Sequence, residues 1–245
     1  MHKFILTLAM VVFLRGETVD EAHYFGGWPK NTLKNTLPNP GFEFDCNDSA
    51  VSKDIGCQCI KDKDCKSGKC FSSPRLGKYC LPNKGTIFPR FKLLDQYGEN
   101  VDLYDFALNG KLIVIELSTA WCQPCRNLAS WMTFGDLKVT QSRMWRDEYS
   151  VIKSLIDEDR VYFINIQVQD KFKNSSSIYS IEEWFQEYPD EKITILADEN
   201  YIVRDWIRAT AYPTVIILNE KMEIIKFSVR GWHDAFNYLV DLEWN

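Results

Sequence analysis

The chain has 245 residues, of which 45% are hydrophobic and 26% are charged. This composition is typical of a globular protein with one core of about 150 residues and further sequence beside it. The 15 Phe, 11 Tyr and 8 Trp residues exclude disorder as the main state, because they can bury a large apolar surface. The net charge of −5 argues against nucleic acid as a partner, since phosphates require a basic face.

The N-terminus has the form of an export signal. A basic start, Met1-His2-Lys3, precedes an uncharged apolar run over residues 4–14, which is too short to span a bilayer. We therefore expect a signal peptide over residues 1–18, with a poorly marked cleavage site, and a secreted or periplasmic protein. A buried N-terminal strand or helix is the alternative. No later apolar run is long enough for a transmembrane span, so we expect none in the mature chain.

Six of the eight cysteines fall in one stretch rich in Gly, Ser and Lys. This stretch has too few aliphatic residues for a core of its own and needs covalent staples. In an exported protein these staples are disulfides, which predicts a disulfide-stapled module over residues 46–84 after a linker over residues 19–45. The sequence does not choose among the 15 possible pairings, and structural zinc is the alternative. The six are Cys46, Cys57, Cys59, Cys65, Cys70 and Cys80.

Residues 86–245 alternate between strand and helix patterns, which indicates an α/β sandwich around one central sheet. The first expected elements are a hairpin over 91–103, a buried strand over 112–117, a helix carrying Leu128, Trp131 and Met132, a helix through Trp145, Tyr149, Ile152 and Ile156, and a strand over 161–168. Next are a helix from a capping box at Ser180 to near Pro189, a strand over 193–196, a helix over 201–207, a hairpin of 214–218 with 222–227, and a last helix carrying Phe236, Leu239, Val240 and Leu242.

The other two cysteines form the motif Trp121-Cys122-Gln123-Pro124-Cys125, between a buried strand and a helix. The N-terminus of a helix presents unpaired N–H groups and the positive end of the dipole, both of which favour a thiolate. Cys122 is therefore the expected nucleophile, and Cys125, one turn later, is placed to resolve a mixed disulfide. Pro124 suits the first turn of the helix. A structural disulfide or half of a zinc site are the alternatives.

Residues 86–245 resemble the thioredoxin fold, and more narrowly the TlpA/ResA-type extracytoplasmic thiol-disulfide oxidoreductases, close to the redoxin group. Besides the cysteine motif, the resemblance rests on the lead-in over 91–98, on the stretch from Asp198 through Ala211-Tyr212-Pro213-Thr214, and on Glu116, six residues before Cys122. It covers about two-thirds of the chain. It implies a thioredoxin-like sandwich with a central mixed β-sheet flanked by helices, preceded here by the small disulfide-rich module.

The resemblance also implies roles for residues around the cysteines. Pro213 would be cis and packed against the cysteine pair, which leaves the backbone of Tyr212 free to pair with an extended substrate strand. Trp121 would contribute to the same substrate-binding surface. An ordinary proline at the edge of a strand is the alternative for Pro213.

Glu116 is a candidate acid-base group on its own chemistry. A carboxyl group inside an apolar run has a raised pKa when it is buried without a charged partner. Such a group can accept the proton of Cys125 as that thiol attacks, through a water molecule. A glutamate at the end of a strand, pointing to solvent, is the alternative.

These features predict a thiol-disulfide oxidoreductase that acts on cysteines of exported proteins, without a cofactor or metal. The resemblance favours a reductase, which needs a redox partner upstream and a client with a disulfide or thiol. Peroxidase chemistry is disfavoured, because residues 118–122 lack the expected arrangement of threonine and arginine around a cysteine. A secreted binding or adhesion protein, with the cysteine-rich module as the working part, is the competing hypothesis. Residues 133–147 look like an insertion, which we interpret as a cap on one side of the fold rather than a wall of a substrate groove.

Overall fold

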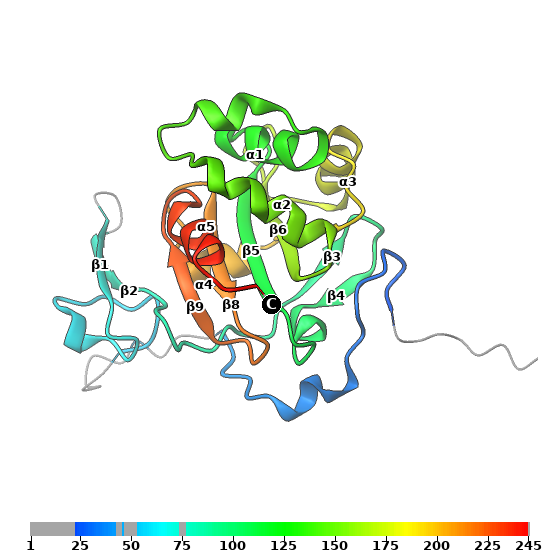
Figure 1. The fold of residues 1–245 in the computed structure, drawn as a ribbon. Helices are drawn as coiled ribbons and strands as arrows, with labels where there is room; N and C mark the ends of the chain where they lie inside the picture. The colour runs from blue at the N-terminus through cyan, green and yellow to red at the C-terminus, as the bar shows by residue number, and fades with distance from the viewer. Residues whose placement is uncertain (1–22, 43–45, 47–52, 74–76, 245) are drawn as a thin grey trace, which may run out of the picture.

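The structure, a computed structural model, describes residues 23–42, 46, 53–73 and 77–244 (Figure 1). The signal peptide expected over residues 1–18 lies outside these ranges. Within them, no helix is both long and apolar enough to cross a membrane.

A seven-stranded mixed sheet forms the centre of the molecule, in the order β4-β3-β7-β6-β5-β8-β9. The central strands β5, β6 and β7 are parallel, and the strands on either side of them are antiparallel to their neighbours. The strands are β3 Lys92–Asp95, β4 Asn100–Asp102, β5 Leu112–Thr119, β6 Val161–Gln169, β7 Ile193–Ala197, β8 Thr214–Leu218 and β9 Ile224–Ser228. The helices are α1 Gln123–Phe134, α2 Ser150–Asp157, α3 Ile178–Glu187, α4 Ile202–Ile207 and α5 His233–Val240.

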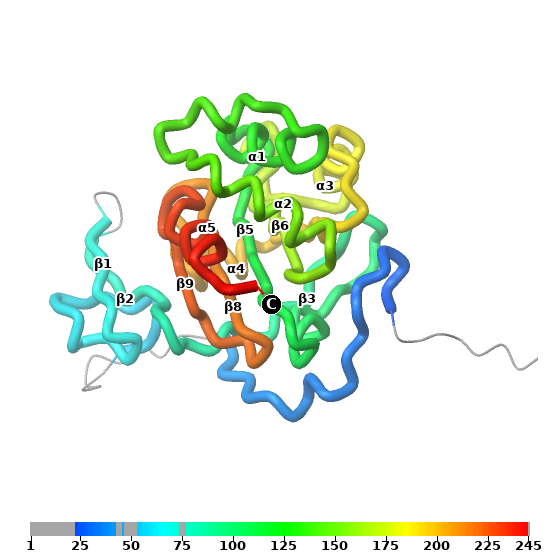
Figure 2. The backbone as a smooth tube through the Cα atoms, viewed as in Figure 1, coloured from blue at the N-terminus to red at the C-terminus, as the bar shows by residue number. Residues whose placement is uncertain are grey.

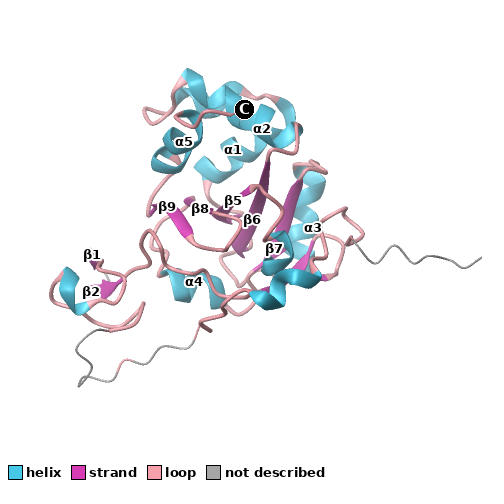
Figure 3. Ribbon diagram, turned by 60° about the horizontal axis from the view of Figure 1, so that its bottom comes forward, coloured by secondary structure: helices cyan, strands magenta, loops and turns pink. Residues whose placement is uncertain are grey.

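Both faces of the sheet are covered, as the near-continuous apolar sequence of β5 requires. One face packs against α1, α2, α3 and α5, and the other against α4 and the segments before β3 and β5. Figure 3 shows α1, α2 and α5 on one side of the strands and α4 on the other. The predicted fold class, an α/β sandwich with a central mixed sheet flanked by helices and preceded by a disulfide-rich region, is confirmed.

Two predicted helix starts are wrong. The helix expected to run through Trp145 begins only at Ser150, because Trp145 turns aside to pack edge-on against Trp131 of α1, with 4.9 Å between the ring centroids. The helix expected to start at Ser180 begins at Ile178. Ser177 is its N-cap, and the Ser180 hydroxyl accepts the Ser177 N–H at 2.9 Å, so Ser180 is the third residue of the helix rather than its cap.

The disulfide-rich region contains one short hairpin, β1 Cys70–Ser73 with β2 Gly77–Cys80. Its six cysteines form three disulfides, Cys46–Cys57, Cys59–Cys70 and Cys65–Cys80. The sulfur atoms of Cys59, Cys65 and Cys80, which could suggest a zinc site, lie within 4.8 Å of one another because two disulfides meet in the middle of the region. In this oxidised form each of these sulfurs is bonded to another cysteine.

This region lies beside β9 (Figures 1 and 2). The connection that follows it pairs with the start of β9: Gly85 donates its N–H to the carbonyl of Ile224, and Ile224 donates to the carbonyl of Thr86, both at 2.8 Å. A second contact reaches the residue after α4, where Arg208 donates to the carbonyl of Gly56 at 3.2 Å. The region is therefore held against the sandwich at two places.

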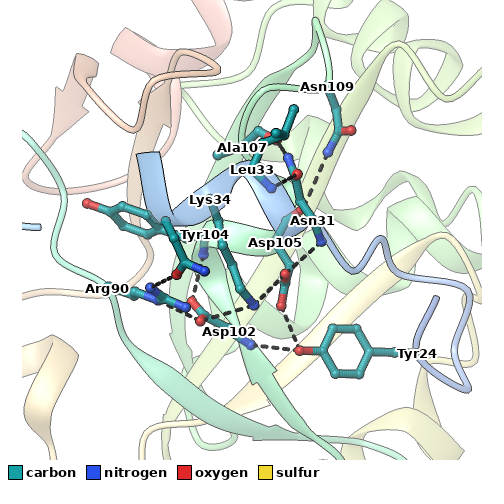
Figure 4. Close-up of polar contacts among 11 residues, drawn as sticks. Tyr24, Asn31, Leu33, Lys34, Arg90, Asp102, Tyr104, Asp105, Ala107 and Asn109 are labelled. Atoms are coloured by element: carbon teal, nitrogen blue, oxygen red, sulfur yellow. Dashed lines mark hydrogen bonds and ion pairs between the residues drawn. The ribbon is translucent and has the colours of Figure 1, made fainter. Parts of the chain in front are cut away.

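Residues 23–42 pass under the end of the sheet opposite α1 (Figure 2). They are tied to the sandwich by a polar cluster centred on Asp105, whose carboxylate accepts bonds from the Tyr24 hydroxyl at 2.7 Å, the Asn31 N–H at 2.8 Å and the Lys34 ammonium at 2.6 Å (Figure 4). Trp28 is buried and donates its indole N–H to Asp95 at 2.9 Å. The stretch expected as a linker is therefore packed on the core over its described residues.

Candidate redox site

The end of β5 and the start of α1 place Cys122 at the N-terminus of a helix, as the sequence predicts. Cys122 is the N-cap of α1, and its Sγ accepts the backbone N–H of Cys125 at 3.3 Å. Pro124 lies within the first turn. The two sulfurs are joined in a disulfide. In the reduced state the same N–H and the positive end of the helix dipole would face the Cys122 sulfur, which favours its thiolate.

The two cysteines differ in access. Cys122 is 4% exposed, whereas Cys125 has no exposed surface. An external thiol or disulfide would therefore meet Cys122 before Cys125. This is the asymmetry expected of an attacking and a resolving cysteine.

The Tyr212–Pro213 peptide bond is cis, as expected. Thr214, the next residue, pairs with Leu117 of β5, and this register places Pro213 beside the segment that ends at Cys122. The ring of Tyr212 packs edge-on against Trp121, with 6.1 Å between centroids. Trp121 is 41% exposed and donates its indole N–H to Gln169 at 3.1 Å. The structure thus brings together the three residues expected on a substrate-binding surface.

The backbone of Tyr212 is open for pairing. Within the described part of the chain, neither its N–H nor its carbonyl has a hydrogen-bond partner. The neighbouring Pro213 carbonyl, in contrast, accepts the N–H of Gly231 at 2.7 Å. An extended chain could therefore bond to Tyr212 without displacing an existing contact.

Glu116 is buried in the layer between the sheet and α1, which removes the alternative of a solvent-facing strand end. Burial raises its pKa to about 7, against an opposing hydrogen bond from the Asn165 amide at 2.8 Å. Its second oxygen, Oε1, has no partner among the residues that the structure describes. Glu116 lines a cavity of about 20 Å³ together with Met132 of α1, a volume that fits one water molecule.

Larger hollows lie away from the cysteine pair. One of about 450 Å³ lies between the disulfide-rich region and Trp206, and another of about 480 Å³ lies between that region and α5. Neither is lined by Cys122 or Cys125.

No protein-family model and no curated protein matches this chain. Among solved structures, a thiol:disulfide interchange protein from Bacteroides sp. is similar at 16% identity, over 64% of this chain and 88% of that one, with a TM-score of 0.44. A putative thiol:disulfide interchange protein DsbE from Chlorobium tepidum is 16% identical over 60% and 84%, with a TM-score of 0.44. An exposed lipoprotein thioredoxin from Streptococcus pneumoniae is 18% identical over 62% and 97%, with a TM-score of 0.43. These three TM-scores are below 0.5, so the function proposed below does not rest on these structures.

The structure adds two polar residues beside Glu116 that sequence reasoning missed. Asn165 of β6 stands directly opposite Glu116 in the parallel pair, and its amide oxygen accepts a hydrogen bond from the Ser118 hydroxyl at 2.8 Å. Ser118, Asn165 and Glu116 therefore form a buried hydrogen-bonded row under the start of α1. The available signal was weak, because Ser118 and Asn165 are two among several polar residues in the second halves of β5 and β6.

Proposed function

We propose that this protein is a thiol-disulfide oxidoreductase that works through the Cys122–Cys125 pair on cysteines of exported proteins. The observation that carries the proposal is the placement of Cys122 as the N-cap of α1, with Cys125 fully buried one turn behind it. This placement supports a reactive thiolate at the surface and a protected resolving thiol. The open backbone of Tyr212 supports a protein client.

In the reductive direction, the Cys122 thiolate attacks one sulfur of a client disulfide. A Cys122–client bond forms, and the other client sulfur leaves as a thiolate. Cys125 then loses its proton and attacks the Cys122 sulfur, which forms the Cys122–Cys125 disulfide and releases the second client thiolate. Two electrons pass from the protein to the client, and a dithiol protein must then return them.

Glu116 is the group we assign to the proton of Cys125. A carboxyl group with a pKa of about 7 is present in both protonation states near neutral pH, which is the property of an effective acid-base group. The cavity beside Glu116 has room for one water molecule, but neither cysteine lines it, so transfer of the Cys125 proton through water is part of the proposal.

The reductive direction and the location outside the cytoplasm belong to the same proposal. The direction follows from the resemblance of the sequence to TlpA/ResA-type proteins. The location follows from the signal-like residues 1–18 and from the three disulfides of the N-terminal region, which persist in oxidising compartments. The partners are therefore a client protein and an upstream dithiol protein of the same compartment.

Turnover of insulin disulfides with dithiothreitol as electron donor tests the proposal. Wild type should turn over, Cys122→Ser should fall to the uncatalysed rate, and Cys125→Ser should accumulate a mixed disulfide with the client. Equal inactivity of wild type and Cys122→Ser would contradict the proposal. Binding of a partner by the intact Cys122→Ser protein, together with that inactivity, would favour the competing function of a secreted binding protein.

A further inference from the structure

An unbroken series of contacts extends from the redox site to residues 133–147. Lys173 lies over the ring of Trp121 at 5.3 Å, and Trp121 contacts Tyr212. Next to Tyr212, the Pro213 carbonyl accepts the N–H of Gly231, and Gly231 lies under Met144. We call this surface the client face, made up of Trp121, Met144, Lys173, Tyr212, Pro213 and Gly231.

From this series we infer that Met144 selects clients. It provides one side of the client face and favours client segments with an apolar residue next to the reacting cysteine. Lys173, which lies over Trp121, and Arg230, which precedes Gly231 in the chain, favour an acidic residue further along the same segment. This inference rests on the proposed function and names the kind of client that the redox site accepts.

The contact between Met144 and Gly231 is close. A Cβ atom placed on Gly231 would lie 2.5 Å from the Met144 methyl carbon and 3.5 Å from its sulfur. Gly231 also has a φ of +78°, a backbone conformation that residues other than glycine rarely adopt. The absence of a side chain here lets Met144 lie directly against the backbone that bonds to Pro213.

Met144 is held in place by the segment that carries it. Val139, in a short 3-10 helix, is buried, and Trp145 packs on Trp131 of α1. Residues 133–147 thus cap α1, as expected, while Met144 itself is 39% exposed and extends the surface beside Pro213. Figure 1 shows this segment arching above the turn that leads into α5.

The chemistry of the face indicates the client. Trp121 and Met144 expose apolar surface at its two sides, and a methionine side chain adapts to apolar residues of different shape. Lys173 and Arg230 are exposed, and no carboxylate within the described residues forms an ion pair with either. An extended segment paired to the Tyr212 backbone would place alternate side chains along this face. A client with an apolar residue beside its cysteine and an acidic residue nearby matches both features.

Three disulfide-linked peptide dimers test the inference. They are identical except for the residues flanking the single cysteine: one carries Ile and Glu, one Ser and Glu, and one Ile and Lys. Reduction by the full-length protein is measured as kcat/KM, and the ratios between peptides are compared within each variant, so that a general loss of activity cancels. Met144→Ser is compared with Met144→Leu and with Leu137→Ser, an exposed position on the same segment.

Wild type should have a higher kcat/KM for the Ile/Glu peptide than for the Ser/Glu peptide. Met144→Ser should lower the ratio of these two values at least about threefold, since the loss of one apolar contact weakens discrimination by this order. Met144→Leu and Leu137→Ser should keep the wild-type ratio. The ratio of kcat/KM for the Ile/Glu peptide to that for the Ile/Lys peptide should fall in the Arg230→Glu variant, and in wild type at high salt. An active wild type with the same Ile/Ser ratio as Met144→Ser would overturn the inference alone, whereas equal inactivity of wild type and Cys122→Ser on all peptides would overturn the proposed function.

Discussion

Glu116 is the residue of the site whose pKa can be tested most directly by experiment. Its carboxyl group is buried, and one of its oxygens accepts a hydrogen bond from the Asn165 amide. Among the residues that the structure describes, no cation forms an ion pair with it. Burial raises its pKa from 4.5 to about 7. A raised pKa in the folded state means that folding favours the protonated form. The stabilisation is complete below about pH 4.5 and is lost as the pH rises through about 7.

Glu116→Gln therefore changes how stability depends on pH. Between pH 5 and pH 9 we expect the free energy of unfolding of wild type to fall by about 3 kcal/mol more than that of the variant, from the pKa shift and the linkage relation. Urea denaturation at a series of pH values measures the difference. Burial also raises the pKa of Asp198 to about 6, but this residue is present in both proteins, so its contribution to the pH dependence cancels in the comparison. Parallel stability curves would contradict the assignment of the titration to Glu116.

At the scale of single residues, spacing predicted where Cys122, Cys125 and Glu116 lie in the fold but not which residues surround them. Cys122, Cys125 and Glu116 are predictable because a motif, a helix start and a charge within an apolar run are local patterns. Asn165 is 49 residues from Glu116 and meets it only through the register of β5 and β6. The contact of Met144 with Gly231 joins an irregular segment to a turn, and no periodic pattern marks either.

At the scale of elements, the apolar patterns predicted which helices and strands exist better than where the helices begin. The start of α3 shows why. Ser177 and Ser180 are both good N-cap residues, and both are used, one as the cap and the other as its partner inside the first turn. The start of α2 was misplaced because the pairing of Trp145 with Trp131 involves two elements and cannot be seen in either alone.

The polar cluster centred on Asp105, which ties residues 23–42 to the sandwich, has the clearest effect on stability among the contacts between elements. Lys34 lies 2.6 Å from Asp105 and 3.3 Å from Asp102, and Arg90 adds a second cation at 2.6 Å from Asp102 (Figure 4). The side chain of Asp105 is only 1% exposed. Its charge is tolerable because Lys34 and the hydrogen bonds of Tyr24 and Asn31 replace water.

Lys34→Met should lower the free energy of unfolding by about 2 kcal/mol, because it leaves Asp105 charged and buried without a cation. Guanidinium denaturation at pH 7 measures the change. The matched control is Lys138→Met, which removes an ion pair whose lysine is 68% exposed and should leave the midpoint unchanged. Equal effects of the two substitutions would show that the cluster does not hold residues 23–42 in place.

At the scale of the whole molecule, the fold class was predictable because strands and helices alternate along residues 86–245. The disulfide pairing was not, since six cysteines close to one another in sequence allow many pairings with similar loop lengths. Nor does composition reveal that residues 23–42 are packed on the sandwich. That docking depends on Trp28, Lys34 and Asp105, which lie far apart in the sequence and meet only in the folded chain.

The molecule as a whole contains two classes of disulfide in different surroundings. Three lie in a region that has little apolar core and depends on them, and only Cys65–Cys80 has both cysteines buried. Cys122–Cys125, in contrast, spans one turn at a helix N-terminus. A helix N-terminus stabilises the reduced form through the thiolate and raises the reduction potential. Redox-active pairs of this kind lie between about −270 and −120 mV, while structural disulfides of exported proteins lie below about −300 mV.

Stepwise reduction of the full-length protein therefore tests the account most directly. The protein is equilibrated in thiol/disulfide buffers of decreasing potential, its thiols are trapped with N-ethylmaleimide, and the modified residues are identified by peptide mass. We predict that the first two thiols appear together at Cys122 and Cys125, above about −270 mV, while the other six cysteines stay oxidised. Trapping of cysteines from residues 46–80 first, or at the same potential, would contradict the division into one working pair and three structural disulfides.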